Sequence, residues 1–101
     1  MDAKYFKDQI CDELTGAQCY IEKAIELKPM APTWSKKLVE MSASELQHAM
    51  YLHDMFMEYY KRMSEAYKRI PKYVQDAYDD VLEMYDGSVA YIKELHTIYN
   101  Q

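Results

Sequence analysis

Apolar residues recur every three or four positions along most of the chain, and no segment shows the strict alternation of a half-buried β-strand. A repeat of three and four residues places apolar side chains on one face of a helix. Prolines divide the pattern into three stretches, with Pro29 and Pro32 at the first joint and Pro71 at the second. We therefore predict an all-α chain with helices over residues 3–28, 34–67 and 71–100.

The joints between these stretches carry residues that stop and start helices. Thr33 or Ser35 is expected to cap the second helix through its side-chain oxygen. Pro71 is expected at the start of the third helix, where its missing N–H costs nothing. The third apolar pattern continues through Asp86 and Gly87, which predicts one helix there, with a break into two shorter helices as the alternative.

Each predicted helix has one stripe that we expect in the core. In the first helix it comprises Phe6, Ile10, Glu13, Ala17, Tyr20, Ala24 and Leu27. In the second it comprises Leu38, Met41, Glu45, His48, Leu52, Met55 and Tyr59. In the third it comprises Val74, Ala77, Val81, Met84, Ser88, Tyr91, Leu95 and Ile98. Three such stripes predict a helix bundle.

Composition narrows the class of protein. At 101 residues the chain is expected to be one small domain, 1–101, of a size at which oligomerisation is a common way to gain core. Its formal net charge of −5 argues against a nucleic-acid partner, although basic residues gather between positions 61 and 72. The sequence has neither a membrane span nor a signal-peptide core, which predicts a cytoplasmic protein without a membrane partner.

Ionisable residues interrupt only two of the three stripes, at Glu13, Glu45 and His48. An unpaired buried carboxylate is costly, and a bound cation removes that cost. Glu45 and His48 are three positions apart and project from the same turn. A Glu from one helix with Glu-x-x-His from its neighbour is how helix bundles ligate metals in their cores. The alternative is a Glu–His pair that satisfies itself by hydrogen bonding.

The residue types of this set favour particular metals. Carboxylate oxygens with one imidazole suit iron or manganese, and zinc fits the same ligands. Further along the second helix, His53, Asp54 and Glu58 are either an entry path for ions or ordinary surface residues.

Two segments, "ELTGAQCYIEKA" from Glu13 and "ELQHA" from Glu45, carry a resemblance to a known family. Together they resemble the first half of a ferritin-like or rubrerythrin-like domain, over residues 6–60. The resemblance implies a carboxylate-bridged di-iron site with Glu13, Glu45 and His48 as ligands. It also implies that Tyr20 is a catalytic neighbour that tunes a ligand or takes part in redox chemistry, and that ferrous iron is oxidised by dioxygen.

The second half of the chain departs from that family pattern. A full ferritin-like chain repeats both motifs, whereas here Glu94 and His96 are two positions apart and face different directions. One chain therefore has half of a di-iron site. It resembles the short encapsulated ferritins, whose site is completed by two chains, and similar short proteins of bacteria and phages. This resemblance implies a bundle completed in a homodimer or larger oligomer, with an encapsulating shell or a virion as a further partner.

A second function remains open at this point. The chain is alternatively a non-catalytic helical interaction protein, such as a phage accessory or virion protein, that retains the ferritin-like scaffold. In that case its tyrosine-rich stripes are partner surfaces, and Glu13, Glu45 and His48 are either vestigial or a structural metal site.

Overall fold

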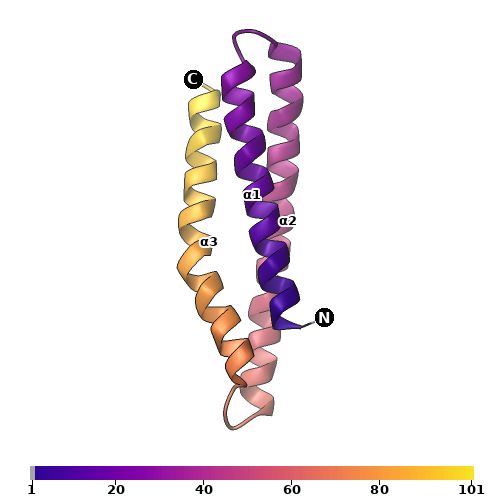
Figure 1. The fold of residues 1–101 in the computed structure, drawn as a ribbon, viewed down its shortest axis with the longest axis vertical. Coiled ribbons are helices and arrows are strands. Elements are labelled where there is room, and N and C mark those ends of the chain that lie inside the picture. Colours follow the sequence, from indigo (N-terminus) through magenta and orange to yellow (C-terminus); the bar gives the residue numbers. More distant parts are fainter. Residues whose placement is uncertain (1) are drawn as a thin grey trace.

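A computed structural model describes residues 2–101, which form three helices lying alongside one another in an elongated bundle (Figure 1). The helices are α1 (Ala3–Leu27), α2 (Pro32–Ala66) and α3 (Lys72–Tyr99). The molecule measures 57 × 21 × 15 Å, and α2 extends past the start of α1 to the turn that leads into α3 (Figure 1). The predicted all-α class is confirmed, and each helix begins and ends within two residues of its predicted bounds.

The helix ends follow from local chemistry, with one difference from prediction. Asp2 accepts a hydrogen bond from the backbone N–H of Tyr5 at 2.9 Å and caps α1. The second helix begins at Pro32, earlier than predicted, because a proline fits the first turn without losing a hydrogen bond. The predicted cap by Thr33 or Ser35 is therefore wrong: no side chain caps the start of α2.

The third helix begins at Lys72, one residue after the predicted start, with Pro71 as its N-cap residue, and it continues without a break through Gly87. Two short helices are therefore excluded for this part of the chain. Because α3 is one continuous helix, it runs back alongside α1 (Figure 1).

The first helix is the centre of the bundle, because it packs against both α2 and α3, whereas those two helices meet only sparsely. Its fully or nearly buried side chains form one stripe: Ala3, Phe6, Ile10, Leu14, Ala17, Ile21 and Ala24. Glu13 and Tyr20 from the predicted stripe are only partly buried, and Leu14 and Ile21 lie in the core beside them.

The core stripe of α2 differs from the predicted one. Its buried residues are Ser35, Ser42, Leu46, Ala49 and Phe56. The predicted stripe lies along the edge of the core instead, and Met41, His48 and Met55 are exposed. The reason is that α1 and α2 approach each other through small residues, which a hydrophobicity pattern weights too lightly. The last part of α3 is shifted in the same way: Ile92 is buried, whereas Tyr91 and Ile98 are exposed.

Two buried serines set the register of α2 against α1. Ser35 Oγ donates to the carbonyl of Ala24 at 2.7 Å, and Ser42 Oγ donates to the carbonyl of Ala17 at 2.6 Å. Because the serines are seven residues apart, they lie on one face, two turns from each other. This pairing places the turn after Ser42, which carries Glu45, against the turn of α1 before Ala17.

The same hydroxyl groups connect both helices to α3. Ser35 Oγ lies 3.0 Å from the hydroxyl of Tyr99, and Ser42 Oγ lies 2.9 Å from Nε2 of His96. The single hydroxyl hydrogen of Ser42 is donated to Ala17, so the bond with His96 requires a hydrogen on Nε2. The imidazole of His96 is partly buried, which lowers its pKa below the ordinary value of 6.5.

We expect the folded protein to lose stability as the pH falls through about 6.5, because the unfolded chain binds a proton at His96 more readily than the folded one. The contribution of His96 to the free energy of unfolding is fully present above the pKa that His96 has in the unfolded chain. It is lost as the pH falls towards the lower pKa that His96 has in the folded protein. Urea unfolding of the wild type and of His96→Gln at about pH 7.5 and about pH 5.5 measures it. The wild type should lose more stability than the variant, and equal losses would exclude His96 as the cause.

Candidate metal centre

Glu13, Glu45 and His48 lie together between α1 and α2. Each offers one ligand atom, and these three atoms lie within 4.8 Å of one another. The Nδ1 atom of His48 is 3.6 Å from Oε2 of Glu13, which is longer than a hydrogen bond. The side chain of Glu13 is 22% exposed and that of His48 is 57% exposed. The cluster therefore has a buried side formed by Glu13 and a side that opens to solvent at His48.

Two features of the sequence bring the three side chains together. Glu45 and His48 are neighbours on one turn of α2, since they are three residues apart. Glu13 reaches them from α1 because the bond between Ser42 and Ala17 fixes which turns of the two helices face each other. The cluster thus depends on local spacing in one helix and on the register between two.

The carboxyl group of Glu13 lacks a hydrogen-bond partner for one of its oxygens. Oε2 of Glu13 is buried, and no donor within residues 2–101 binds it. The pKa of Glu13 is raised, first by a hydrogen bond with Glu45 that exists only when a proton is shared, next by burial, and then by charge repulsion from Glu45. His48 opposes this rise. Two carboxylates that face each other in this way attract a positive charge.

These observations fit a divalent transition metal ion. The donor set of two carboxylates and one imidazole suits iron, manganese or zinc. An ion within reach of Oε2 would give that oxygen the partner that it lacks and would replace the shared proton. Since three protein ligands do not fill the coordination sphere of these metals, the exposed side of the cluster leaves positions for water, substrate or another chain.

Tyr20, the predicted catalytic neighbour, is two turns further along α1 than Glu13. It is partly buried and makes no side-chain hydrogen bond with any residue between 2 and 101. At 1.5 Å per residue, seven residues separate the two backbone positions by about 10 Å. The structure thus shows no interaction through which Tyr20 acts on a ligand.

Gly16 lies between Glu13 and Tyr20 on α1 and faces the carboxylate of Glu45. A glycine has no chemistry that would single it out in the sequence. Its position in the middle of a helix, where glycine is unfavourable, is the only signal that it carries.

Three further polar residues of α2 serve other contacts. The ring of His53 stacks on Tyr85 of α3, with centroids 3.8 Å apart, and its Nδ1 atom lies 3.8 Å from Asp54. Glu58 accepts a hydrogen bond from Arg62 at 2.7 Å on the surface. Asp54 and Glu58 are thus exposed, whereas the side chain of His53 is largely covered.

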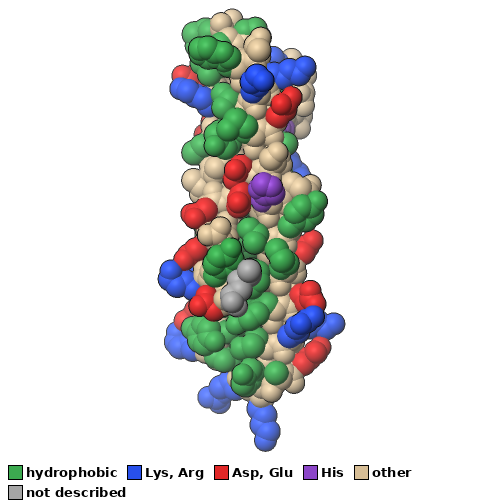
Figure 2. Space-filling model, turned by 90° about the vertical axis from the view of Figure 1, so that its right-hand side faces the viewer, with side chains coloured by type: hydrophobic (Ala, Val, Ile, Leu, Met, Phe, Trp, Pro, Cys, Tyr) green, Lys and Arg blue, Asp and Glu red, His purple; other side chains and the backbone are tan. Residues whose placement is uncertain are grey.

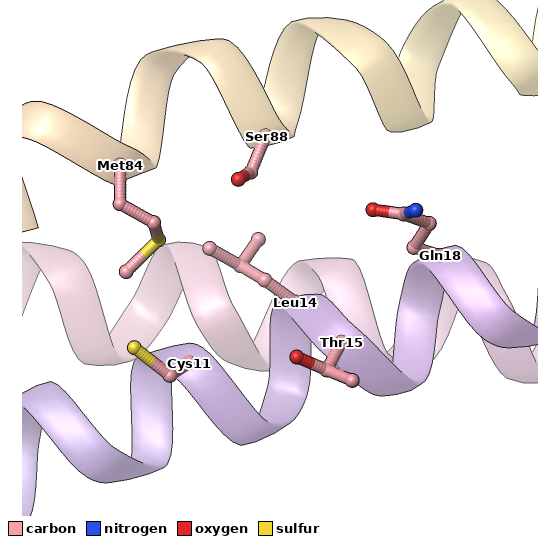
Figure 3. Close-up of a pocket in the computed structure, with 6 residues that line it drawn as sticks. All are labelled: Cys11, Leu14, Thr15, Gln18, Met84 and Ser88. Atoms are coloured by element: carbon pink, nitrogen blue, oxygen red, sulfur yellow. The ribbon is translucent and has the colours of Figure 1, made fainter.

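A small cavity of about 120 Å³ lies between α1 and α3, where the side chains of Cys11 and Met84 point towards each other (Figure 3). It is lined by Cys11, Leu14, Thr15, Gln18, Met84 and Ser88. Burial raises the pKa of the Cys11 thiol, which favours its protonated form. Pockets for organic ligands enclose roughly 300 Å³ or more, so this cavity is a packing space.

One face of the molecule carries a histidine, acidic side chains and exposed hydrophobic side chains (Figure 2). A histidine lies beside acidic side chains near mid-length, and hydrophobic side chains gather towards both ends of this face (Figure 2). Along α2 the exposed side chains of Met41 and Met55 lie on either side of Glu45 and His48.

None of the three helices within residues 2–101 carries an apolar stretch of the length that crosses a membrane. A comparison of the sequence with protein-family models, with curated proteins and with solved structures found no match.

Proposed function

We propose that this protein binds a divalent transition metal ion at Glu13, Glu45 and His48, with iron as the first choice and manganese or zinc as alternatives. The observation that carries the proposal is the meeting of three ligand side chains around a buried carboxylate oxygen that has no hydrogen-bond partner within residues 2–101. When ferrous iron is bound, it supplies one electron to an oxidant such as dioxygen.

The proposal includes a second copy of the chain. On α2, a stripe with steps of three and four residues runs from Trp34 to Tyr59. The spacing and the types of residue are the same on both sides of its middle. Outwards from the centre, the pairs are Glu45 with His48, Met41 with Leu52, Leu38 with Met55, and Trp34 with Tyr59. Each pair joins two ligands, two aliphatic residues or two aromatic residues.

A stripe of this kind is complementary to itself. A twofold axis between Glu45 and His48 would lay α2 of one copy antiparallel to α2 of the other, with apolar residues on apolar residues. Met41 and Met55 are each 45% exposed in the single chain, and such an axis would bury both of them. The same axis would bring Glu45 of one copy opposite His48 of the other.

Two copies would complete a site for two ions. Each chain supplies one set of Glu13, Glu45 and His48, and the axis doubles it. We assign Glu13 as the bridging carboxylate, because it alone comes from α1. Glu45 and His48 of each chain would together hold one ion from α2. The reaction proposed for this pair is the oxidation of ferrous iron, as substrate, by dioxygen.

A second candidate function is favoured by apolar surface outside this stripe. Tyr51, Tyr73 and Leu82 are all more than half exposed. Exposed aromatic residues are typical of partner surfaces. In this alternative the chain is a non-catalytic helical protein that docks on an encapsulating shell or a virion, and its Glu/His cluster is structural or vestigial.

We expect Fe²⁺, added without oxygen, to stabilise the wild type against heat and to leave Glu45→Ala unchanged. A ligand that binds only the folded state at about 100 times its Kd adds about 2.7 kcal/mol to the free energy of unfolding. For a domain of this size that corresponds to a rise in Tm of about 10 °C or more. Calorimetry measures the Tm of both proteins with and without Fe²⁺. An equal rise in Tm in both would contradict Glu45 as a ligand of the metal.

A further inference from the structure

Gly16 of α1 makes an unusually close approach to one side chain of α2. A Cβ atom at position 16 would lie 3.2 Å from Oε2 of Glu45, 3.5 Å from its Cδ and 3.7 Å from its Cγ. All three of the nearest atoms belong to the same carboxylate side chain. A separation of 3.2 Å is shorter than an ordinary van der Waals contact of carbon with oxygen, so an alanine here would have to displace Glu45.

The rest of the chain provides an internal comparison. The sequence has one other glycine, Gly87, which also lies inside a long helix. A Cβ atom at Gly87 would meet nothing within 4 Å among the described residues. Both glycines weaken their helices relative to alanine, because glycine loses more backbone freedom on folding. Only Gly16 has a carboxylate in the space that a side chain would occupy.

The location of that space connects Gly16 with the metal centre. Gly16 is one turn after Glu13 on α1, and the carboxylate of Glu45 lies against its bare backbone. In this position the carboxylate of Glu45 has a ligand atom within 4.8 Å of ligand atoms of both Glu13 and His48. A methyl group at position 16 would push the Glu45 carboxylate away from α1, where Glu13 lies.

We infer that Gly16 is a positioning residue for the metal centre: its missing side chain provides the space that lets the Glu45 carboxylate converge with Glu13 and His48. The inference rests on the proposed metal-binding function and assigns a residue to it that has no ligand atom. Displacement by a few tenths of an ångström is enough to matter, because metal–ligand distances vary by only about 0.2 Å.

The test compares the wild type, Gly16→Ala and Gly87→Ala. Affinity for Fe²⁺ is measured without oxygen by competition with a ferrous chelator. We expect Gly16→Ala to weaken Fe²⁺ binding roughly ten-fold or more, as residues that orient metal ligands commonly do. Gly87→Ala should bind as the wild type does. Equal affinities in all three proteins would overturn the role of Gly16 and leave the proposed function intact, whereas a wild type that binds no Fe²⁺ would overturn both.

A second measurement is independent of metal. Thermal unfolding of the metal-free protein is recorded for each glycine variant, alone and combined with Glu45→Ala. Alanine at position 16 should raise the Tm more when Glu45 is absent, because the crowded carboxylate has been removed. Alanine at position 87 should raise the Tm equally in both backgrounds. The same gain at position 16 in both backgrounds would show that Gly16 does not act through Glu45.

Discussion

Ferrous iron mixed with the protein in air is expected to be oxidised much faster than in buffer, and Glu13→Ala is expected to return the rate to that of buffer. The reason is that each ferrous ion loses one electron, so two neighbouring ions together reduce one dioxygen molecule, which with two protons from water becomes hydrogen peroxide. Glu13 is the carboxylate from α1 that we assign to both ions. Without it, Glu45 and His48 can still bind iron, but the two ions are no longer held as a pair. Stopped-flow absorbance of ferric iron follows the rate.

A suitable control for this experiment is Glu22→Ala, which removes an exposed carboxylate from the same helix. It should oxidise iron as fast as the wild type. A wild type no faster than buffer would lead us to abandon iron oxidation and to retain the non-catalytic scaffold function. A Glu13→Ala variant as fast as the wild type would instead remove the bridging role from Glu13.

The double variant Met41→Lys, Met55→Lys is expected to be a monomer of 12.0 kDa, whereas the wild type should have at least twice that mass at micromolar concentration. The two methionines lie on either side of the proposed twofold axis and are each 45% exposed in the single chain. Lysines in their place would put four positive charges into a small apolar interface of two copies, where each charge would lose its hydration. Light scattering measures the mass.

The control for the assembly experiment makes the same change of charge elsewhere. Met30→Lys with Leu82→Lys replaces two exposed apolar side chains that lie outside the stripe on α2. This variant should retain the mass of the wild type. A wild type that is a stable monomer would contradict the shared site, and a dimer unaffected by lysine at Met41 and Met55 would place the interface on another face.

The helices could be predicted from the sequence because their signals are local. Pro29, Pro32 and Pro71 indicate the two joints to within two residues, and the uninterrupted pattern around Gly87 indicates one long third helix. The core face of α2 could not be predicted in the same way. Ser35 and Ser42 are polar, yet they are buried because each hydroxyl donates to a carbonyl of α1. Such bonds depend on the neighbouring helix, which a hydrophobicity pattern does not contain.

The three residues of the cluster could be predicted, although the stripe predicted for the core of α2 lies at the edge of the core in the structure. Glu45 and His48 share a turn in any helical register, so a small rotation of α2 moves them together. Glu13 lies on the adjoining edge of α1 and stays within their reach. The buried Oε2 atom of Glu13 and the contact of Glu45 with Gly16 could not be predicted, because both depend on how closely the two helices approach.

The most direct test of the proposed metal centre is to count the iron that it holds. The wild type, Glu45→Ala and Glu40→Ala are loaded with Fe²⁺ without oxygen, freed of unbound iron and subjected to elemental analysis. Glu40 is the matched control, since it is an exposed carboxylate that lines the same hollow of the surface as Glu45. We predict about one iron per chain in the wild type and in Glu40→Ala, and almost none in Glu45→Ala. A wild type that retains no more iron than Glu45→Ala would contradict a metal centre at these residues.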